Sequence, residues 1–311
     1  MFPEPCFVET NGISMAVYEQ GTGTPVIFLH GFPELAFSWR FQLPALAEAG
    51  FRAIAIDQRG YGNTSVPPNV DDYRIEELMA DVEGLLDALG LDSAIFVGHD
   101  WGSLVLWYLA MFSPGRIDRL VQLNIPHTPR PPVDPIEIFR ERLGEDFYIV
   151  DFQNSNAADR EFEADPRHFI DMMMRKNQVR RAQFEQLPAH MRSISLRQIM
   201  ARTEPSGDAL LSDEELDYYE AAYRKSGFTG AINRYRNWTH NWEILEGVNQ
   251  VIEIPTLFIG AVDDVVIPLE SIEAMKPLVP NLEMHMLEPC GHWTQQERPD
   301  DVNRIILDWL S

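Results

Sequence analysis

One short segment of this sequence combines a candidate nucleophile with the backbone that would expose it. GHDWG, residues 98–102, follows an apolar strand-like run and precedes the helix-like SLVLWYLAMF. Glycines on both sides of a central residue are typical of a nucleophile elbow, a tight strand-to-helix turn that projects its central side chain above a sheet. That side chain is here the carboxylate of Asp100. Capping of the next helix is the alternative role for Asp100, but a cap does not require glycine at both flanks.

The partners expected of such a nucleophile come later in the sequence, an acid first and a histidine after it. Asp263 and Asp264 end one strand-like run, and His292 follows the last one. Either aspartate could orient the histidine. Cys290 is the other candidate nucleophile here, but it lacks an elbow and is expected to be a small packing residue. The order predicts a triad of Asp100, one of the two later aspartates, and His292.

A carboxylate nucleophile restricts the chemistry. Its attack on an electrophilic sp³ carbon gives an alkyl ester of the enzyme, which water activated by a histidine–aspartate pair can hydrolyse. An epoxide or an alkyl halide suits this reaction. Esters and amides fit poorly, because the product of attack would be an anhydride.

The sequence lacks the motifs that would bring in a metal or cofactor. HExxH, paired CxxC, GxGxxG and GxxxxGK[ST] are all missing. We therefore expect neither a metal nor a cofactor.

The elements that would position these residues follow an α/β pattern. Residues 6–21 predict a β-hairpin that turns at Asn11-Gly12, a dipeptide suited to positive φ angles. Residues 74–89 carry apolar side chains at helical spacing. Short apolar runs of the kind found in buried parallel strands lie at 25–31, 52–57, 94–100, 119–124, 255–260 and 282–288. The pattern predicts a mostly parallel sheet flanked by helices.

A long insertion interrupts this pattern. Five prolines in residues 126–135 break both regular periods, and residues 136–247 contain no strand-like run but many aromatic side chains. Such a helical lid must bury an aromatic face on the sheet domain, and ligand cavities commonly form at such junctions. We predict an α/β core in two parts, 1–127 and 248–311, with a helical lid (cap) domain over 128–247.

Composition limits the partners and the cellular location. The chain has 25 Lys and Arg against 48 Asp and Glu, a net charge of −23, which disfavours nucleic acid and anionic membranes as partners. Its two cysteines cannot form a disulfide framework, and no apolar run is long enough to span a membrane. A cytoplasmic protein is expected, and its oligomeric state, monomer or homodimer, is left open.

Beyond these local patterns, the chain resembles the epoxide hydrolase branch of the α/β-hydrolase fold (soluble epoxide hydrolase-like) over essentially its whole length. Two departures separate it from dehalogenases with the same elbow. Haloalkane dehalogenases usually carry Asn where this chain has Phe32, and fluoroacetate dehalogenases have arginines where Ser103 and Leu104 stand. The segments that carry the resemblance are HGFPE (30–34), 38–57, RGYGNTS (59–65), GHDWG (98–102), SGFTGAINRYRN (226–237) and CGHWTQQERP (290–299).

The resemblance implies roles for particular residues. It favours Asp264 over Asp263 as the acid that orients His292. It also implies that the backbone N–H groups of Phe32 and Trp101 form an oxyanion hole for the tetrahedral intermediate of ester hydrolysis.

Two lid tyrosines in this family donate hydrogen bonds to the epoxide oxygen. Tyr235, in NRYRNW, matches one of them. The other normally precedes Phe-Gln directly, and this chain has Asp151 in that position, with Tyr148 one helical turn earlier. Tyr148, a protonated Asp151, or no second donor are the alternatives, with Tyr148 or no donor favoured over Asp151.

The expected function is therefore hydrolysis of a small apolar epoxide to a vicinal diol through an Asp100 ester. A haloalkane or haloacid dehalogenase using the same nucleophile is one alternative. A ligand-binding protein without catalysis on the same scaffold is the other. The preferred epoxide, regioselectivity and enantioselectivity depend on lid geometry that spacing does not define.

Overall fold

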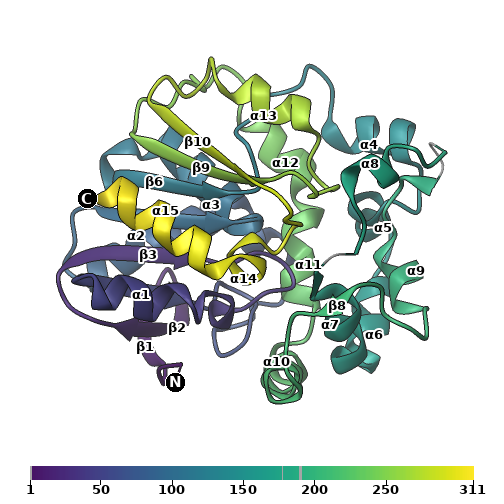
Figure 1. Ribbon diagram of the computed structural model, residues 1–311, viewed down its shortest axis with the longest axis horizontal. Coiled ribbons are helices and arrows are strands. Elements are labelled where there is room, and N and C mark those ends of the chain that lie inside the picture. Colours follow the sequence, from purple (N-terminus) through teal and green to yellow (C-terminus); the bar gives the residue numbers. More distant parts are fainter. Residues whose placement is uncertain (1, 177, 189–190) are drawn as a thin grey trace.

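The main sheet runs through the middle of the molecule and ends at the lid (Figure 1). The computed structural model describes residues 2–176, 178–188 and 191–311. Eight strands lie in the order β1-β2-β4-β3-β5-β6-β9-β10. β2 pairs antiparallel with β1 and β4, and every other pair is parallel, which confirms the predicted sheet. The strands are Cys6–Thr10 (β1), Ile13–Gln20 (β2), Thr24–Leu29 (β3), Phe51–Ile56 (β4), Ala94–His99 (β5), Ile117–Leu123 (β6), Thr256–Ala261 (β9) and Leu282–Leu287 (β10).

The N-terminal hairpin forms where it was predicted. Thr10 pairs with Ile13, and the two residues between them have positive φ, 42° for Asn11 and 74° for Gly12. Asparagine and glycine tolerate this left-handed backbone better than other residues, so this dipeptide closes a two-residue turn.

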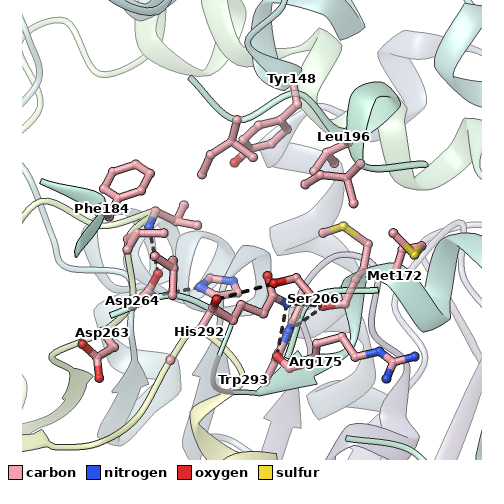
Figure 2. A pocket seen from close by; sticks show the side chains of 18 of the residues that line it. Tyr148, Met172, Arg175, Phe184, Leu196, Ser206, Asp263, Asp264, His292 and Trp293 are labelled. Atoms are coloured by element: carbon pink, nitrogen blue, oxygen red, sulfur yellow. Dashed lines mark hydrogen bonds and ion pairs between the residues drawn. The ribbon is translucent and has the colours of Figure 1, made fainter. Parts of the chain in front are cut away.

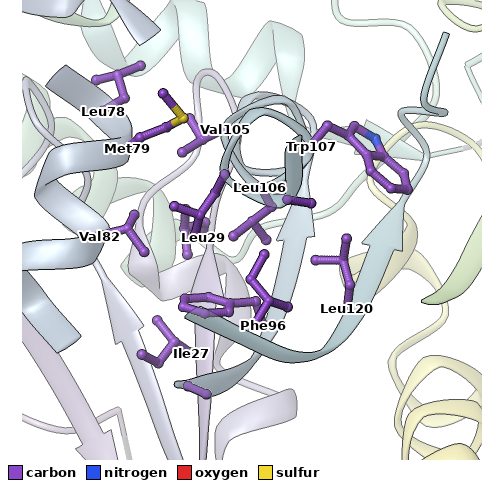
Figure 3. Close-up of a cluster of buried hydrophobic side chains, with 14 of the residues drawn as sticks. Ile27, Leu29, Leu78, Met79, Val82, Phe96, Val105, Leu106, Trp107 and Leu120 are labelled. Atoms are coloured by element: carbon purple, nitrogen blue, oxygen red, sulfur yellow. The ribbon is translucent and has the colours of Figure 1, made fainter. Parts of the chain in front are cut away.

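Helices cover both faces of the sheet. One face packs against α2 (Ile75–Ala88), α3 (Trp101–Phe112) and α13 (Leu269–Met275), in a cluster that includes Leu29, Phe96 and Leu106 (Figure 3). α2 confirms the helix predicted over 74–89. The other face packs against α1 (Gln42–Glu48) and α15 (Pro299–Leu310). Because both faces are covered, the central strands are buried throughout and appear in the sequence as continuous apolar runs.

Three short 3₁₀ turns and one short helix complete the core. They are η1 (Ala36–Trp39), η2 (Val70–Tyr73), η3 (Pro114–Arg116) and α14 (Thr294–Glu297).

The chain between β6 and β9 forms the helical layer that lies beside the sheet in Figure 1. Its helices are α4 (Pro135–Leu143), α5 (Tyr148–Asn154), α6 (Ala157–Ala164), α7 (Pro166–Met173), α8 (Arg181–Phe184), α9 (Leu196–Met200), α10 (Asp213–Ser226), α11 (Thr229–Arg236) and α12 (Trp238–Glu243). One feature differs from the prediction, because Arg175–Lys176 (β7) and Asp208–Ala209 (β8) form a small antiparallel pair. Strands of only two residues are too short to show an alternating pattern in the sequence.

The aromatic residues of this lid pack on one another and on the core. Their cluster joins lid residues such as Phe162 and Phe228 to Phe32 and Trp101 of the core. The burial expected from the aromatic content of the insertion is therefore present. These contacts, together with those of Arg181 to residues 264 and 267, place the lid over the loops that follow β3, β5, β9 and β10.

Candidate active site

Asp100 sits at a strained turn between β5 and α3. Its φ and ψ are 49° and −118°, an uncommon conformation for a residue with a side chain. Neighbouring glycines make the turn possible. A Cβ on Gly102 would lie 2.1 Å from the Leu29 carbonyl oxygen, and one on Gly31 would lie 2.4 Å from Asp100 Cβ. Helix α3 can therefore approach β3 closely enough to lift the Asp100 carboxylate above the sheet edge.

The two candidate oxyanion-hole residues flank this carboxylate. The Phe32 backbone N–H donates to Asp100 Oδ1 at 2.8 Å. Trp101 is the first residue of α3, where backbone N–H groups have no partner within the helix. This hydrogen bond holds Oδ1 in place, and Oδ2 is the carboxylate oxygen available for nucleophilic attack.

His292 lies between two carboxylates. Its Nδ1 is 2.8 Å from Asp264 Oδ2, and its Nε2 is 3.8 Å from Asp100 Oδ2. Burial by itself would lower the pKa of His292, but the Asp264 carboxylate outweighs burial and raises this pKa to about 9. Burial likewise opposes the charged form of Asp264, and the adjacent His292 nevertheless holds the pKa of Asp264 below its usual value.

Asp263 faces away from this histidine. Its carboxylate accepts the Arg181 backbone N–H at 2.9 Å and the Arg180 guanidinium at 2.7 Å. Of the two aspartates that the sequence left open, the structure places Asp264 against His292 and Asp263 against the lid.

The two lid tyrosines face the elbow from across the cavity. Tyr235 on α11 is buried, and its ring centroid lies 5.7 Å from that of Tyr148 on α5 and 5.0 Å from that of Trp101. Burial, and next the Asp100 charge, raise the pKa of both tyrosines well above the usual value. Both are therefore neutral hydroxyl donors at physiological pH.

Asp151 is directed elsewhere. Its Oδ1 lies 3.4 Å from Arg197 Nη1, and Arg197 also pairs with Glu161. The cavity lining includes Tyr148 but not Asp151. Of the two candidate second donors, the structure brings Tyr148 to the site.

A cavity of about 340 Å³ connects these groups to the lid (Figure 2). Figure 2 shows Tyr148 on the opposite side of this cavity from Asp264 and His292. Most of the lining surface is apolar, and three lid arginines, Arg175, Arg180 and Arg202, also reach the cavity. The apolar lid residues include Met172, Met173, Phe184, Leu187, Met191, Ile194, Leu196 and Ile199. A neutral, largely apolar molecule matches this lining.

Comparison with known proteins places this geometry in a family. The family model described as the alpha/beta hydrolase fold matches residues 24–299. Epoxide hydrolase A of Mycobacterium tuberculosis is 39% identical, with 99% of this chain and 98% of the relative aligned. The crystal structure of epoxide hydrolase A from Mycobacterium thermoresistibile superimposes with a TM-score of 0.89 at 38% identity, covering 99% of this chain and 98% of the other. The chain belongs to the epoxide hydrolases of the α/β-hydrolase fold.

Another relative of this epoxide hydrolase family is longer. The bifunctional epoxide hydrolase 2 of Sus scrofa is 38% identical over 96% of this chain, which spans 53% of the pig protein. Within the described residues, no helix of the present family member is long and apolar enough to cross a membrane.

In this epoxide hydrolase, a second buried carboxylate, which no local sequence pattern predicted, joins the loops of the site. Glu34 Oε2 lies 2.6 Å from His99 Nδ1, and His99 Nε2 lies 2.8 Å from the His292 carbonyl oxygen. Burial would raise the pKa of Glu34, but His99 outweighs it and lowers this pKa to about 2. Gln295 and Gln296 both donate to Glu34 Oε1. The elbow, the loop after β3 and the loop after β10 thus share one polar centre.

Two further residues hold the histidine and its acid. Asn124 Nδ2 donates to Asp264 Oδ2 at 2.8 Å. Glu297 accepts the backbone N–H groups of Gly291 and Trp293, on either side of His292. Asn124 directly follows β6 and has a positive φ of 65°. No short sequence motif identifies it as a residue of the site.

Proposed function

We propose that this protein hydrolyses an apolar epoxide to a vicinal diol through an ester of Asp100. The observation that carries the proposal is the arrangement around the cavity. Asp100 lies at its base, beside the His292–Asp264 pair, and the Tyr235 and Tyr148 rings face Asp100 from the lid. This set supplies a nucleophile, a base and two acids on opposite sides of one bound molecule.

The first half-reaction opens the ring. Asp100 Oδ2 attacks a ring carbon, forming a carbon–oxygen bond, and the bond from that carbon to the epoxide oxygen breaks. Negative charge develops on the leaving oxygen, where Tyr235 and Tyr148 donate hydrogen bonds and supply a proton. A second donor at Tyr148 would take the place of the tyrosine that Asp151 replaces in the sequence.

The second half-reaction hydrolyses the ester. His292 takes a proton from water, and the resulting hydroxide attacks Cγ of the Asp100 ester. The tetrahedral oxyanion forms on Oδ1, where the Phe32 N–H already lies 2.8 Å away and the Trp101 N–H completes the hole. Collapse breaks the bond from Cγ to the alkyl oxygen, which takes the proton from His292 and leaves as the second hydroxyl of the diol. The remaining water proton returns to the tyrosine that protonated the epoxide oxygen. The diol therefore carries one oxygen from Asp100, and the water oxygen remains in the restored carboxylate.

Ester formation also prepares the base. The Asp100 charge is one of the groups that raise the pKa of His292 to about 9, so the histidine holds a proton in the resting enzyme near neutral pH. The ester is neutral, and its formation removes that charge 3.8 Å from Nε2. The pKa of His292 therefore falls in the intermediate, and the resting proton passes to solvent, which leaves the neutral imidazole that water activation requires.

An isotope experiment tests the covalent route. In a single turnover in ¹⁸O-water with enzyme in excess, the first diol is expected to carry no label, because its new oxygen comes from Asp100. The protein should gain the label, and later diols should contain it. Stoichiometric label in the first diol would rule out the Asp100 ester.

The two alternative functions are tested by the same preparation. A dehalogenase would release halide from alkyl halides faster than it opens a styrene-oxide-type epoxide. A non-catalytic binding protein would bind such ligands without turnover. The relatives compared above are named as epoxide hydrolases, which favours the epoxide over either alternative.

A cytoplasmic location is part of the proposal. Both cysteines, Cys6 and Cys290, are free thiols, as is typical of proteins from reducing compartments.

A further inference from the structure

Consecutive arginines of the lid hold the loop that carries Asp264. This acid loop, residues 262–267, follows β9 and forms part of the cavity wall. Arg181, at the start of α8, is buried against the loop with 9 % of its surface exposed. Its Nη1 lies 3.7 Å from the exposed carboxylate of Glu185. The rest of its guanidinium is directed at the core.

The guanidinium binds backbone carbonyls on both sides of the catalytic acid. Arg181 Nε donates to the Val262 oxygen at 2.6 Å, and Nη2 donates to the Ile267 oxygen at 2.7 Å. Nη2 also donates to the carbonyl oxygen of Asp264 itself. A planar group with fixed donor directions that joins three carbonyls of one turn restricts the conformation of that turn.

Asp263 adds a second attachment between the same segments. Its two carboxylate oxygens accept the Arg181 backbone N–H and the Arg180 guanidinium. The contact therefore runs in both directions, from a lid side chain to core carbonyls and from a core side chain to lid donors.

We infer that Arg181 is a positioning residue that aims Asp264 at His292 and so acts on ester hydrolysis rather than on ester formation. The inference rests on the proposed function, because it assigns Arg181 to the second half-reaction of that mechanism. The Asp264 side chain has its own partners in Asn124 and the Val266 N–H, at 2.8 and 3.0 Å. Those bonds orient the carboxylate within the loop, whereas Arg181 fixes the loop itself.

Ring opening does not depend on this contact. It uses the Asp100 carboxylate, the Phe32 N–H and the lid tyrosines, and the hydrogen bonds of the Arg181 side chain all end on residues 262–267. Loss of the guanidinium should therefore slow one half-reaction and spare the other. A defect in overall folding would slow both.

The test compares the two half-reactions in single turnovers with enzyme in excess over a styrene-oxide-type epoxide. Rapid quenching followed by intact-protein mass measurement gives the fraction of Asp100 ester at each time. For Arg181→Met we expect ester formation within about 2-fold of wild type and ester hydrolysis slower by about 10- to 100-fold, the scale of a small misplacement of catalytic groups. The ester should then accumulate in the steady state.

Two variants serve as references. Arg181→Lys should recover part of the hydrolysis rate, because an ammonium group can still donate to carbonyls but lacks the planar fork. Arg224→Met is the matched control and should hydrolyse the ester at the wild-type rate. Arg224 is another lid arginine, but it is 57% exposed and pairs with Glu220 of its own helix.

Equal slowing of both half-reactions in Arg181→Met, or unchanged hydrolysis, would overturn the inference. If Arg181→Met does not fold, Arg181→Lys and Asp263→Ala decide by the same ratio, and each should slow hydrolysis selectively. Wild-type enzyme that turns over without any ester would instead refute the proposed function, so the two failures are distinguishable.

Discussion

At the scale of single residues, the proposed mechanism uses some side chains that touch the substrate and others that hold those side chains in place. It predicts that removing Asp100 and removing His292 affect different half-reactions. Asp100→Asn should lower kcat by about 10⁴-fold or more, because no ester can form. Short expression times limit deamidation back to aspartate. His292→Gln should instead form the ester and retain it, which intact-protein mass measurement would detect. An Asp100→Asn enzyme with near wild-type turnover would contradict the covalent mechanism.

The identity of the second acid is also a question about single residues. Tyr148→Phe and Tyr235→Phe should each slow ester formation by about 10²-fold, because each removes a donor to the leaving oxygen. Asp151→Asn should change ester formation by less than about 2-fold, because its carboxylate faces Arg197. Pre-steady-state ester formation is the measurement. A large loss in Asp151→Asn with little loss in Tyr148→Phe would reverse the assignment.

The His292–Asp264 pair links protonation to stability. His292 has a pKa of about 9 in the folded protein against an ordinary value of 6.5, so the folded state binds this proton more tightly than the unfolded chain. The resulting stabilisation is fully present below pH 6.5 and is lost as the pH rises to about 9. We expect the difference in unfolding free energy between wild type and His292→Gln to shrink over that window, as measured by urea denaturation. A difference that grows with pH would have the wrong sign for this pair.

At the scale of elements, the elbow depends on the close approach of α3 and β3. Gly102→Ala should destabilise the protein by about 3 kcal/mol or more, because its Cβ would overlap the backbone of Leu29. Gly115→Ala is the matched control, since a Cβ there meets nothing within 4 Å. Thermal unfolding of the two variants gives the comparison. Similar melting temperatures would show that α3 and β3 can move apart without loss of stability.

The elements also show what local sequence patterns can predict. The strands and α2 were predictable because burial on one or both faces leaves a periodic or continuous apolar run. The elbow was predictable because its glycines are adjacent in sequence. β7 and β8 were not predictable, because strands of two residues are too short to carry a pattern.

The polar residues that support the site could be identified only from the fold. Glu34 meets His99 across 65 residues, and Asn124 meets Asp264 across 140 residues, so no local spacing relates them. Local spacing likewise could not decide whether Asp263 or Asp264 contacts His292. The two are neighbours in one turn, and their opposite directions depend on that turn and on the lid arginines beside it.

At the scale of the whole molecule, the excess of acidic residues acts on what approaches the cavity. A net charge of −23 repels anions at distances up to about 10 Å in 0.1 M salt. We expect kcat/KM for a neutral epoxide to change by less than about 2-fold between low and high salt, and kcat/KM for a carboxylate-bearing epoxide to rise as salt screens the repulsion. Initial rates at a series of salt concentrations measure both. A fall with salt for the carboxylate substrate would mean that Arg175, Arg180 and Arg202, which line the cavity, outweigh the overall charge.

The lid enters and leaves the sheet domain at a single place. His127 Nε2 donates to the Gln250 carbonyl oxygen at 2.7 Å, and the Arg130 N–H donates to the Gln250 side chain at 2.7 Å, so the outgoing and returning segments are bonded to each other. A protein built this way can exchange its whole lid by recombination at two joints that lie side by side in the fold. Asp100, Asp264 and His292 all lie outside the exchanged stretch, whereas Tyr148, Arg181 and Tyr235 lie within it, so a foreign lid would have to supply their equivalents.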